Sequence, residues 1–190
     1  MAHIYLALVD TPGLFASLIR CFIHQRHIHV VISMDPRLEE AYSVGRRNPF
    51  IPILAGFEKE DKEKIYRAFP TANYMIYELE CSGEQKRRLQ EALHRDYRRR
   101  YQFHYTVIGL PLIVLGIPFY QKNHYTCSSY IARLLEECDM PVSEKHFSLV
   151  TPRDFYEYPK KRKIFEGFLS ELVHGQSIYA KYRVQAGGGI

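Results

Sequence analysis

The chain has 190 residues, of which 46% are hydrophobic, 25% charged and 14% aromatic, a composition typical of globular proteins and unlike that of disordered ones. This length allows one domain with a hydrophobic core but excludes two independent cores. Much of the formal net charge of +5 comes from residues 86–100 and 159–165, and the first of these segments also carries acidic residues and has helical apolar spacing, which indicates a solvated helix face, so we expect no nucleic-acid partner.

The first third of the chain predicts strands and one helix. The apolar run HIYLALVD at 3–10 ends at a Thr-Pro-Gly turn and predicts a strand. Residues 14–22 place apolar side chains on one face and predict a helix. The β-branched run HIHVVISM at 27–34, the turn DPR and the extended segment LEEAYSVG predict a β-hairpin. Residues 46–57 contain two prolines and show no period, so we expect a loop.

The middle of the chain alternates helical and extended patterns. The charged residues 58–69 predict a short helix, the alternating residues 73–81 a strand, and residues 82–100 a helix with Ser82 at its N-cap. The apolar stretch from Thr106 to Tyr120 is too short for a membrane crossing and is interrupted by prolines. We expect it to form a buried helix or the wall of a groove.

The last third predicts two helices and a strand. Five residues share one face of a helix that begins at Cys127, namely Tyr130, Ile131, Leu134, Leu135 and Cys138. A Thr-Pro pair at 151–152 marks the start of a short helix, and residues 163–173 predict a final strand. The chain therefore predicts an α+β fold, a small antiparallel sheet packed against helices, with a single domain at 1–175 and a flexible tail at 176–190.

The cysteines indicate a reducing compartment. The chain has four of them without Cys-x-x-Cys spacing, which argues against a zinc knuckle or a disulfide scaffold. The N-terminal segment lacks the features of a signal peptide, so we expect a cytoplasmic protein. His27 and His29 share a strand face, which leaves a metal site open, but no acidic or cysteine partner follows at ligand spacing. We expect no metal and no cofactor.

Cys127 is the candidate nucleophile. A thiol reacts as the thiolate, which the positive end of a helix and a nearby histidine both stabilise. Thr126 suits the N-cap of such a helix, and the preceding residues QKNHYT are polar. The alternative is a buried small residue, which is also the simpler explanation for the remaining three cysteines, Cys21, Cys81 and Cys138.

A Cys–His pair requires a histidine fixed by a third polar group. His29 opens the β-branched strand and is the candidate base, in competition with His24, His27 and His124. If the hairpin turns at DPR, the residue opposite His29 is Ser43. Ser43 is therefore the expected third residue, with Glu40 and Tyr42 as alternatives.

Four segments in this order, HVVISMD, EAYSVGRRNPF, NHYTCSSYIARLLEE and SLVTPRDF, resemble the circularly permuted branch of the NlpC-type papain-like cysteine hydrolases. The similarity is greatest to bacterial YycO-like members, and lecithin retinol acyltransferase-like proteins belong to the same group. In permuted members the histidine precedes the cysteine, as it does here. The resemblance covers most of residues 3–170.

The resemblance implies a permuted papain-like fold with Cys127 as nucleophile and His29 as base. The family's third position falls on the second hairpin strand, where many relatives have a stronger polar group than Ser43. The implied reaction is acyl transfer through a Cys–His thiolate. The backbone N–H of Cys127 would bind the oxyanion together with Gln121 or His124.

The sequence therefore predicts a cysteine hydrolase or acyltransferase that cleaves an amide bond in a peptide or cell-wall-type peptide. Two alternatives stay open: an inactive binding module with the same fold, and an enzyme for lipid-like acyl substrates, for which the apolar segments would wall a groove. The expected partners are a peptide or acyl small molecule, together with peripheral contact to an anionic membrane surface.

Overall fold

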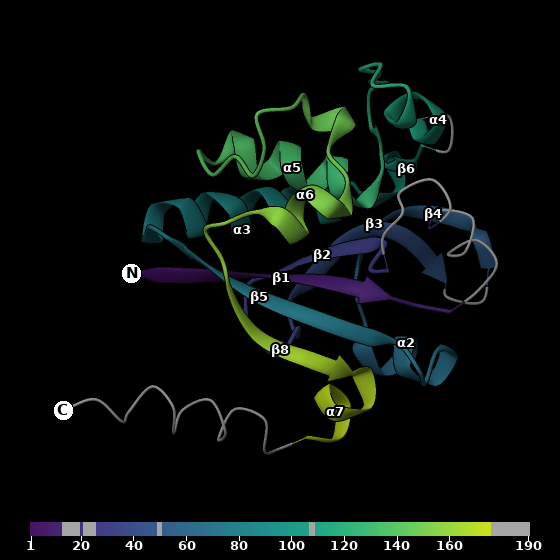
Figure 1. Cartoon of the computed structure of the whole chain (residues 1–190), viewed down its shortest axis with the longest axis vertical. Coiled ribbons are helices and arrows are strands. Elements are labelled where there is room, and N and C mark those ends of the chain that lie inside the picture. The colour runs from purple at the N-terminus through teal and green to yellow at the C-terminus, as the bar shows by residue number, and fades with distance from the viewer. Residues whose placement is uncertain (13–19, 21–25, 49–50, 107–108, 176–190) are drawn as a thin grey trace.

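The structure, a computed structural model, describes residues 1–12, 20, 26–48, 51–106 and 109–175. It has an α+β fold in which an antiparallel sheet carries helices on both faces (Figure 1). Helices α3 (Gly83–Arg98) and α5 (Cys127–Glu137) pack on one face, and α2 (Lys62–Ala68) and α7 (Leu169–His174) pack on the other. The predicted α+β class is therefore confirmed.

The sheet has the strand order β4-β3-β2-β1-β5-β8 over the described residues, and all neighbours pair antiparallel. Its strands are β1 (Ala2–Asp10), β2 (His29–Ser33), β3 (Ala41–Asn48), β4 (Ile51–Lys59), β5 (Asn73–Cys81) and β8 (Arg162–Phe168). The predicted strands at 3–10 and 73–81 are confirmed as β1 and β5. Leu6 and Ala7 of β1 are buried on opposite faces, which explains the unbroken apolar run of this central strand.

The turn between β2 and β3 is held by one carboxylate. Asp35 accepts hydrogen bonds from the backbone N–H groups of Arg37, Glu39 and Glu40 at 2.8, 3.2 and 2.7 Å. Leu38 adopts a φ of 59°, in the left-handed region. The turn is therefore longer than the three residues DPR that the sequence pattern suggested.

The longer turn changes the register of the hairpin. Ile32 pairs with Tyr42, and extending this register sets His29 opposite Gly45 rather than opposite Ser43. The difference is two residues, so Ser43 keeps the face that was predicted for it. Over the described residues, β2 and β3 pair only at Ile32 and Ser33, so the strands separate toward His29.

The prediction of a loop at 46–57 is wrong. β3 continues to Asn48, and β4 begins at Ile51 and pairs with it through partners such as Gly45 and Gly56. β4 lies at the edge of the sheet, where a proline such as Pro52 is tolerated because only one side of the strand needs hydrogen bonds. Proline content therefore indicated an edge strand here, not a loop.

Both helices on the first face begin with a capping box. Ser82 exchanges hydrogen bonds with Gln85 at the start of α3, as does Thr126 with Ser129 at the start of α5. The predicted helix starts at Ser82 and Cys127 are confirmed. The apolar stripes of the two helices meet the sheet in one core cluster, which fixes α5 against β2 and β3.

Shorter elements complete the fold. They are the 3₁₀ helices Arg100–Gln102 and Phe147–Leu149, β6 (His104–Tyr105), β7 (His124–Tyr125), α4 (Gly109–Val114) and α6 (Pro152–Glu157). β6 and β7 form a small parallel sheet. The predicted helix at 58–69 is confirmed as α2 only over Lys62–Ala68, since Glu58 and Lys59 belong to β4, and the predicted helix start at 151–152 is confirmed as that of α6. The predicted strand at 163–173 is β8 only as far as Phe168, after which the chain forms α7.

The apolar stretch from Thr106 to Tyr120 is not a buried helix. α4 is only six residues long, and the side chains of Leu115 and Ile117 after it are 68% and 50% exposed. Its end is anchored by the backbone N–H of Phe119, which donates to Ser148 at 3.2 Å. The expectation of a buried helix is therefore wrong for this part of the stretch.

Two predicted segments lie outside the described residues: most of the helix at 14–22 and the tail at 176–190. Within the described ranges, no helix combines the length and the apolar character that a membrane crossing needs.

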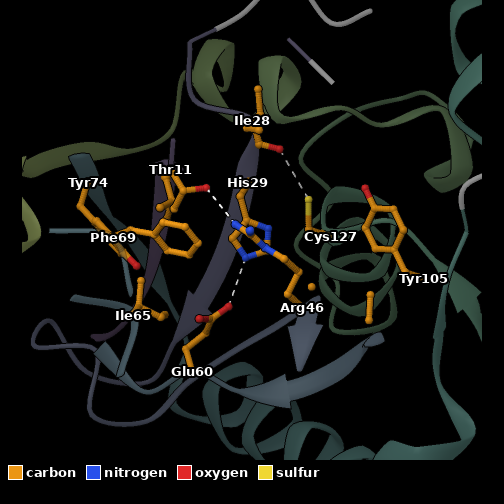
Figure 2. A pocket seen from close by; sticks show the side chains of 13 residues that line it. Thr11, Ile28, His29, Arg46, Glu60, Ile65, Phe69, Tyr74, Tyr105 and Cys127 are labelled. Atoms are coloured by element: carbon orange, nitrogen blue, oxygen red, sulfur yellow. Dashed lines mark hydrogen bonds and ion pairs between the residues drawn. The ribbon is translucent and has the colours of Figure 1, made fainter. Parts of the chain in front are cut away.

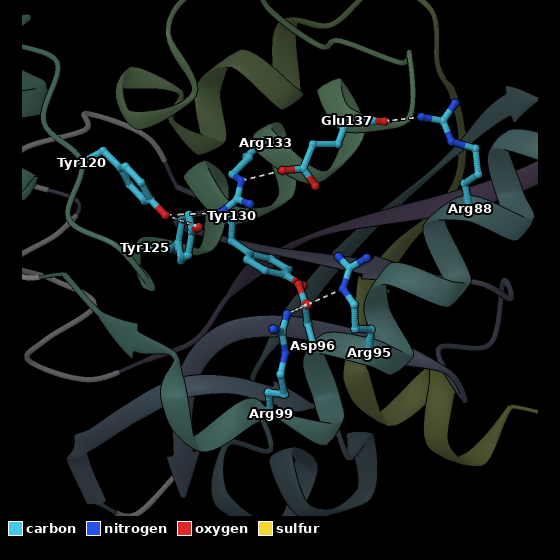
Figure 3. A network of polar contacts seen from close by, with 9 residues as sticks. All are labelled: Arg88, Arg95, Asp96, Arg99, Tyr120, Tyr125, Tyr130, Arg133 and Glu137. Carbon is cyan, nitrogen blue, oxygen red and sulfur yellow. Dashed lines mark hydrogen bonds and ion pairs between the residues drawn. The ribbon is translucent and has the colours of Figure 1, made fainter.

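A buried carboxylate joins α3 to α5. Asp96 accepts a hydrogen bond from the Tyr130 hydroxyl at 3.1 Å and pairs with Arg95 and Arg99 at 3.2 and 3.0 Å (Figure 3). Tyr130 also packs against Phe57 of β4, with ring centroids 4.7 Å apart. This contact ties the helix that begins at Cys127 to both α3 and the sheet.

We predict that Asp96→Ala destabilises the protein by about 1–3 kcal/mol, because the buried Tyr130 hydroxyl loses its acceptor. Glu91→Ala removes an exposed carboxylate from the same helix and is the matched control, which should leave the unfolding midpoint nearly unchanged. Urea unfolding followed by circular dichroism measures both. Equal losses in the two variants would contradict the role assigned to Asp96.

Candidate active site

Cys127 is the first residue of α5 and is buried, with 4% of its surface exposed. Thr126 caps the helix, and the preceding Tyr125 of β7 is fully buried, so the sulfur has a fixed position. The Cys127 Sγ lies 3.8 Å from the carbonyl oxygen of Ile28, the residue before His29. The helix start thus brings the thiol to the beginning of β2, 99 residues earlier in the chain.

His29 lies between the thiol and a carboxylate. Its Nε2 is 3.1 Å from Glu60 Oε1, within hydrogen-bond and ion-pair distance. Figure 2 shows the ring with Cys127 on one side and Glu60 on the other. The arrangement is that of a thiol, an imidazole and an orienting carboxylate.

Glu60 follows β4 directly and is fixed by two contacts with β3. Its backbone N–H donates to the carbonyl of Ala41 at 2.8 Å, and its carboxylate accepts a hydrogen bond from the Ser43 hydroxyl. The same oxygen, Oε1, thus serves both Ser43 and His29. Ser43 therefore orients the carboxylate that in turn orients the imidazole.

The pKa values of the pair shift in opposite directions. Burial disfavours the His29 cation, but the Cys127 and Glu60 side chains outweigh it through hydrogen bonds and charge, and raise the pKa of His29 from 6.5 to about 10. Burial likewise opposes the thiolate, but His29 and the backbone N–H groups of Val30 and Ser128 lower the pKa of Cys127 below its ordinary 9.0. The two shifts together favour the thiolate–imidazolium form of the pair.

The sign of each shift defines a pH window. The interactions that raise the pKa of His29 stabilise the folded protein fully below about pH 6.5, the pKa of histidine in the unfolded chain. This stabilisation is lost as the pH rises through the folded-state pKa of about 10. The interactions that lower the pKa of Cys127 stabilise the folded protein fully above pH 9.0, the ordinary pKa of the thiol. This stabilisation is lost as the pH falls through the lowered pKa of the folded state.

A cavity of about 90 Å³ opens beside the pair. Its polar walls come from Cys127, His29, Glu60, Arg46 and Thr11. Its other walls are mostly apolar or aromatic: Val9, Ile28, Gly45, Ala55, Ile65, Phe69, Tyr74 and Tyr105. An apolar cavity with a few convergent polar groups is typical of a small-molecule or side-chain binding site.

Gly45 provides the space for the imidazole. A Cβ atom at this position would lie 2.9 Å from His29 Cε1 and 3.3 Å from Ser43 Oγ, the first of which is too short for a relaxed contact. Gly45 belongs to β3, the strand between β2 and β4. The missing side chain therefore lets His29 and Glu60 meet across the intervening strand.

The structure corrects the expected third residue. The side chain that contacts His29 is Glu60, whereas Ser43 contacts Glu60. Glu40 instead binds Gln90 and His94 of α3, and the ring of Tyr42 stacks on Phe57 in the core. Glu60 was missed because the preceding β4 was interpreted as a loop.

The expected oxyanion donors lie elsewhere. Gln121 is exposed, the Nδ1 of His124 contacts the carbonyl of Lys122, and neither is among the described residues that line the cavity. Tyr105 lines the cavity instead, and Figure 2 shows its ring beside Cys127. Burial and the Cys127 charge raise the pKa of Tyr105, so its hydroxyl keeps its proton. No motif in the sequence distinguished this tyrosine.

The other cysteines and His27 do not contribute to this site in the described part of the chain. Burial raises the pKa of both Cys81 and Cys138, and Cys21 lies outside the described residues. His27 Nε2 contacts Asn73 at 3.2 Å, away from His29. In the described part of the chain, no three His, Cys, Asp or Glu side chains cluster as metal ligands would.

Comparison with known proteins adds no relative, since no protein-family model and no curated protein matches the chain.

We predict that Gly45→Ala slows alkylation of Cys127 by at least about tenfold, because a shift of the imidazole by a few tenths of an ångström weakens the ion pair. Gly83→Ala is the matched control, since a Cβ there meets no atom within 4 Å. Rates of iodoacetamide labelling at pH 6 measure both. An unchanged rate in Gly45→Ala would contradict the proposed crowding.

We also predict that Cys127→Ala lowers the pKa of His29 from about 10, because the thiolate that favours the imidazolium is removed. Glu60→Gln should lower it too. ¹⁵N chemical shifts of the imidazole nitrogens during a pH titration measure both effects. Identical His29 titration curves in wild type and both variants would rule out the ion pair.

Proposed function

We propose that the protein is a cysteine hydrolase or acyltransferase that cleaves an amide bond, with a peptide or cell-wall-type peptide as the substrate class. The observation that carries the proposal is the convergence of Cys127, His29 and Glu60 on one cavity. These residues come from the start of α5, the start of β2 and the position directly after β4, and titratable groups with perturbed pKa values that converge on a cavity are typical of functional sites.

The first step is acylation. The Cys127 thiolate attacks the carbonyl carbon and forms a carbon–sulfur bond, while the carbonyl electron pair moves to oxygen. When the tetrahedral intermediate collapses, the carbon–nitrogen bond breaks and the amine leaves with the proton of the His29 imidazolium. Glu60 keeps the ring oriented through both events and stabilises its charged form.

The second step releases the acyl group. Neutral His29 takes a proton from water, or from another acceptor, and the resulting nucleophile attacks the thioester carbonyl. The carbon–sulfur bond breaks and the thiolate and the imidazolium are restored. Hydrolase and acyltransferase differ only in the acceptor.

Two donors are suited to the oxyanion. The backbone N–H of Cys127 lies in the first turn of a helix, where N–H groups have no partner within the helix. The Tyr105 hydroxyl is the second, because it keeps its proton beside the thiolate and its strand pairs with β7 just before Cys127.

A lipid-like acyl substrate is the second candidate. The observation that favours it is the run of exposed apolar side chains at the end of α4 and directly after it, namely Val114, Leu115 and Ile117, which would suit peripheral contact with an anionic membrane surface. A third candidate is an inactive binding module. A reducing compartment such as the cytoplasm is proposed because the described cysteines are free thiols.

Labelling with iodoacetamide at pH 6 tests the proposal. Cys127 should react faster than Cys81 and Cys138, whose pKa values are raised by burial, and His29→Ala should abolish the preference. Peptide mapping by mass spectrometry identifies the labelled cysteine. A folded protein in which Cys127 reacts no faster than the other two would refute the enzyme and favour the binding module.

A further inference from the structure

Arg46 extends into the same cavity from β3. Its Nη2 donates to the Thr11 hydroxyl at 3.3 Å, and its guanidinium carbon lies 4.7 Å above the ring of Phe69 (Figure 2). The hydrogen bond to Thr11 fixes one edge of the guanidinium, and the Phe69 ring covers one of its faces. They leave most of its five N–H groups without a protein acceptor among the described residues.

The charge of Arg46 is not neutralised by a direct ion pair. No carboxylate of the described residues lies within 4.0 Å of its guanidinium, and Glu60, the acidic side chain of the cavity, already serves His29 and Ser43. Burial lowers the pKa of Arg46, and the charge of Glu60 compensates only in part. A partly desolvated cation with unused donors is costly unless an anion completes it.

We propose that Arg46 forms an anion subsite, so that the substrate of the Cys127 centre carries a carboxylate or phosphate group next to the bond that is cleaved. This inference rests on the proposed function and names its substrate class. The planar guanidinium presents paired N–H groups that match either oxyanion, and the Phe69 ring and Thr11 hold it in orientation. The apolar walls from Val9, Ile65 and Tyr74 would bind the uncharged part of the same substrate.

A different role for Arg46 would be to keep Glu60 ionised. In that role Arg46 acts on the reactivity of Cys127 toward every reagent alike, because it acts through Glu60 and His29. An anion subsite acts on charged reagents selectively. The two roles therefore differ in a measurable ratio.

Iodoacetate and iodoacetamide measure this ratio, because they alkylate the same thiol and differ by a carboxylate. In wild type and in Arg46→Gln, the rate constants for Cys127 are determined with both reagents at constant ionic strength. The ratio of the iodoacetate to the iodoacetamide rate should fall by about tenfold in Arg46→Gln, as expected for one lost charge-assisted contact. Arg98→Gln is the matched control, since Arg98 is exposed on α3 and should leave the ratio unchanged.

Arg46→Lys separates charge from geometry and serves if Arg46→Gln does not fold. A lysine keeps the charge but lacks the paired donors, so the ratio should take an intermediate value. Equal reduction of both rates in Arg46→Gln would overturn the subsite in favour of the role through Glu60. A ratio unchanged in both Arg46 variants would also overturn it.

Protection of wild type identifies the anion. Acetate and inorganic phosphate are each added during iodoacetamide labelling, with chloride at equal ionic strength as reference. Slower labelling with acetate indicates a carboxylate substrate, slower labelling with phosphate indicates a phosphate group, and protection by neither overturns the subsite. If iodoacetamide labels Cys127 no faster than Cys81 and Cys138, the proposed function itself fails. This outcome differs from failure of the anion subsite alone, in which Cys127 is still labelled fastest.

Discussion

The hydrogen bond between His29 and Glu60 is the contact on which the site depends, because it joins an inner strand of the sheet to its edge. His29 is the first residue of β2 and Glu60 directly follows β4, with β3 between the two strands. They meet because β2 and β3 separate toward His29 and because the facing position of β3 is Gly45. The imidazole then occupies the space above the middle strand, where the thiol at the start of α5 can reach it.

The charges of the site are balanced locally. The thiolate of Cys127, the imidazolium of His29 and the carboxylate of Glu60 form a continuous row, and Ser43 donates to the last of them. In a medium of low polarity each charge is maintained only by its neighbour, so the pKa shifts of His29 and Cys127 are two aspects of one interaction. The lowered pKa of Cys127 is therefore a property of the fold itself and needs no ligand.

Local signals predicted much of the fold and half of the site. Strands β1 and β5 and helices α3 and α5 follow from apolar period and caps, and the placement of Cys127 at a helix start follows from Thr126. The third residue could not be found in this way, because its position depends on a turn widened by Asp35 and on an edge strand that contains Pro52 and whose sequence is therefore typical of a loop. Tyr105 and Arg46 were missed because nothing local shows that they line a cavity with Cys127.

Gly45 has a consequence for how this fold can diverge. It lies in the middle of a strand whose stability does not require glycine, so a larger residue there could be accommodated once the imidazole is no longer needed. Among chains that share this sheet, only those with glycine at this position have room for an imidazole placed as His29 is here, in contact with a carboxylate that follows the edge strand.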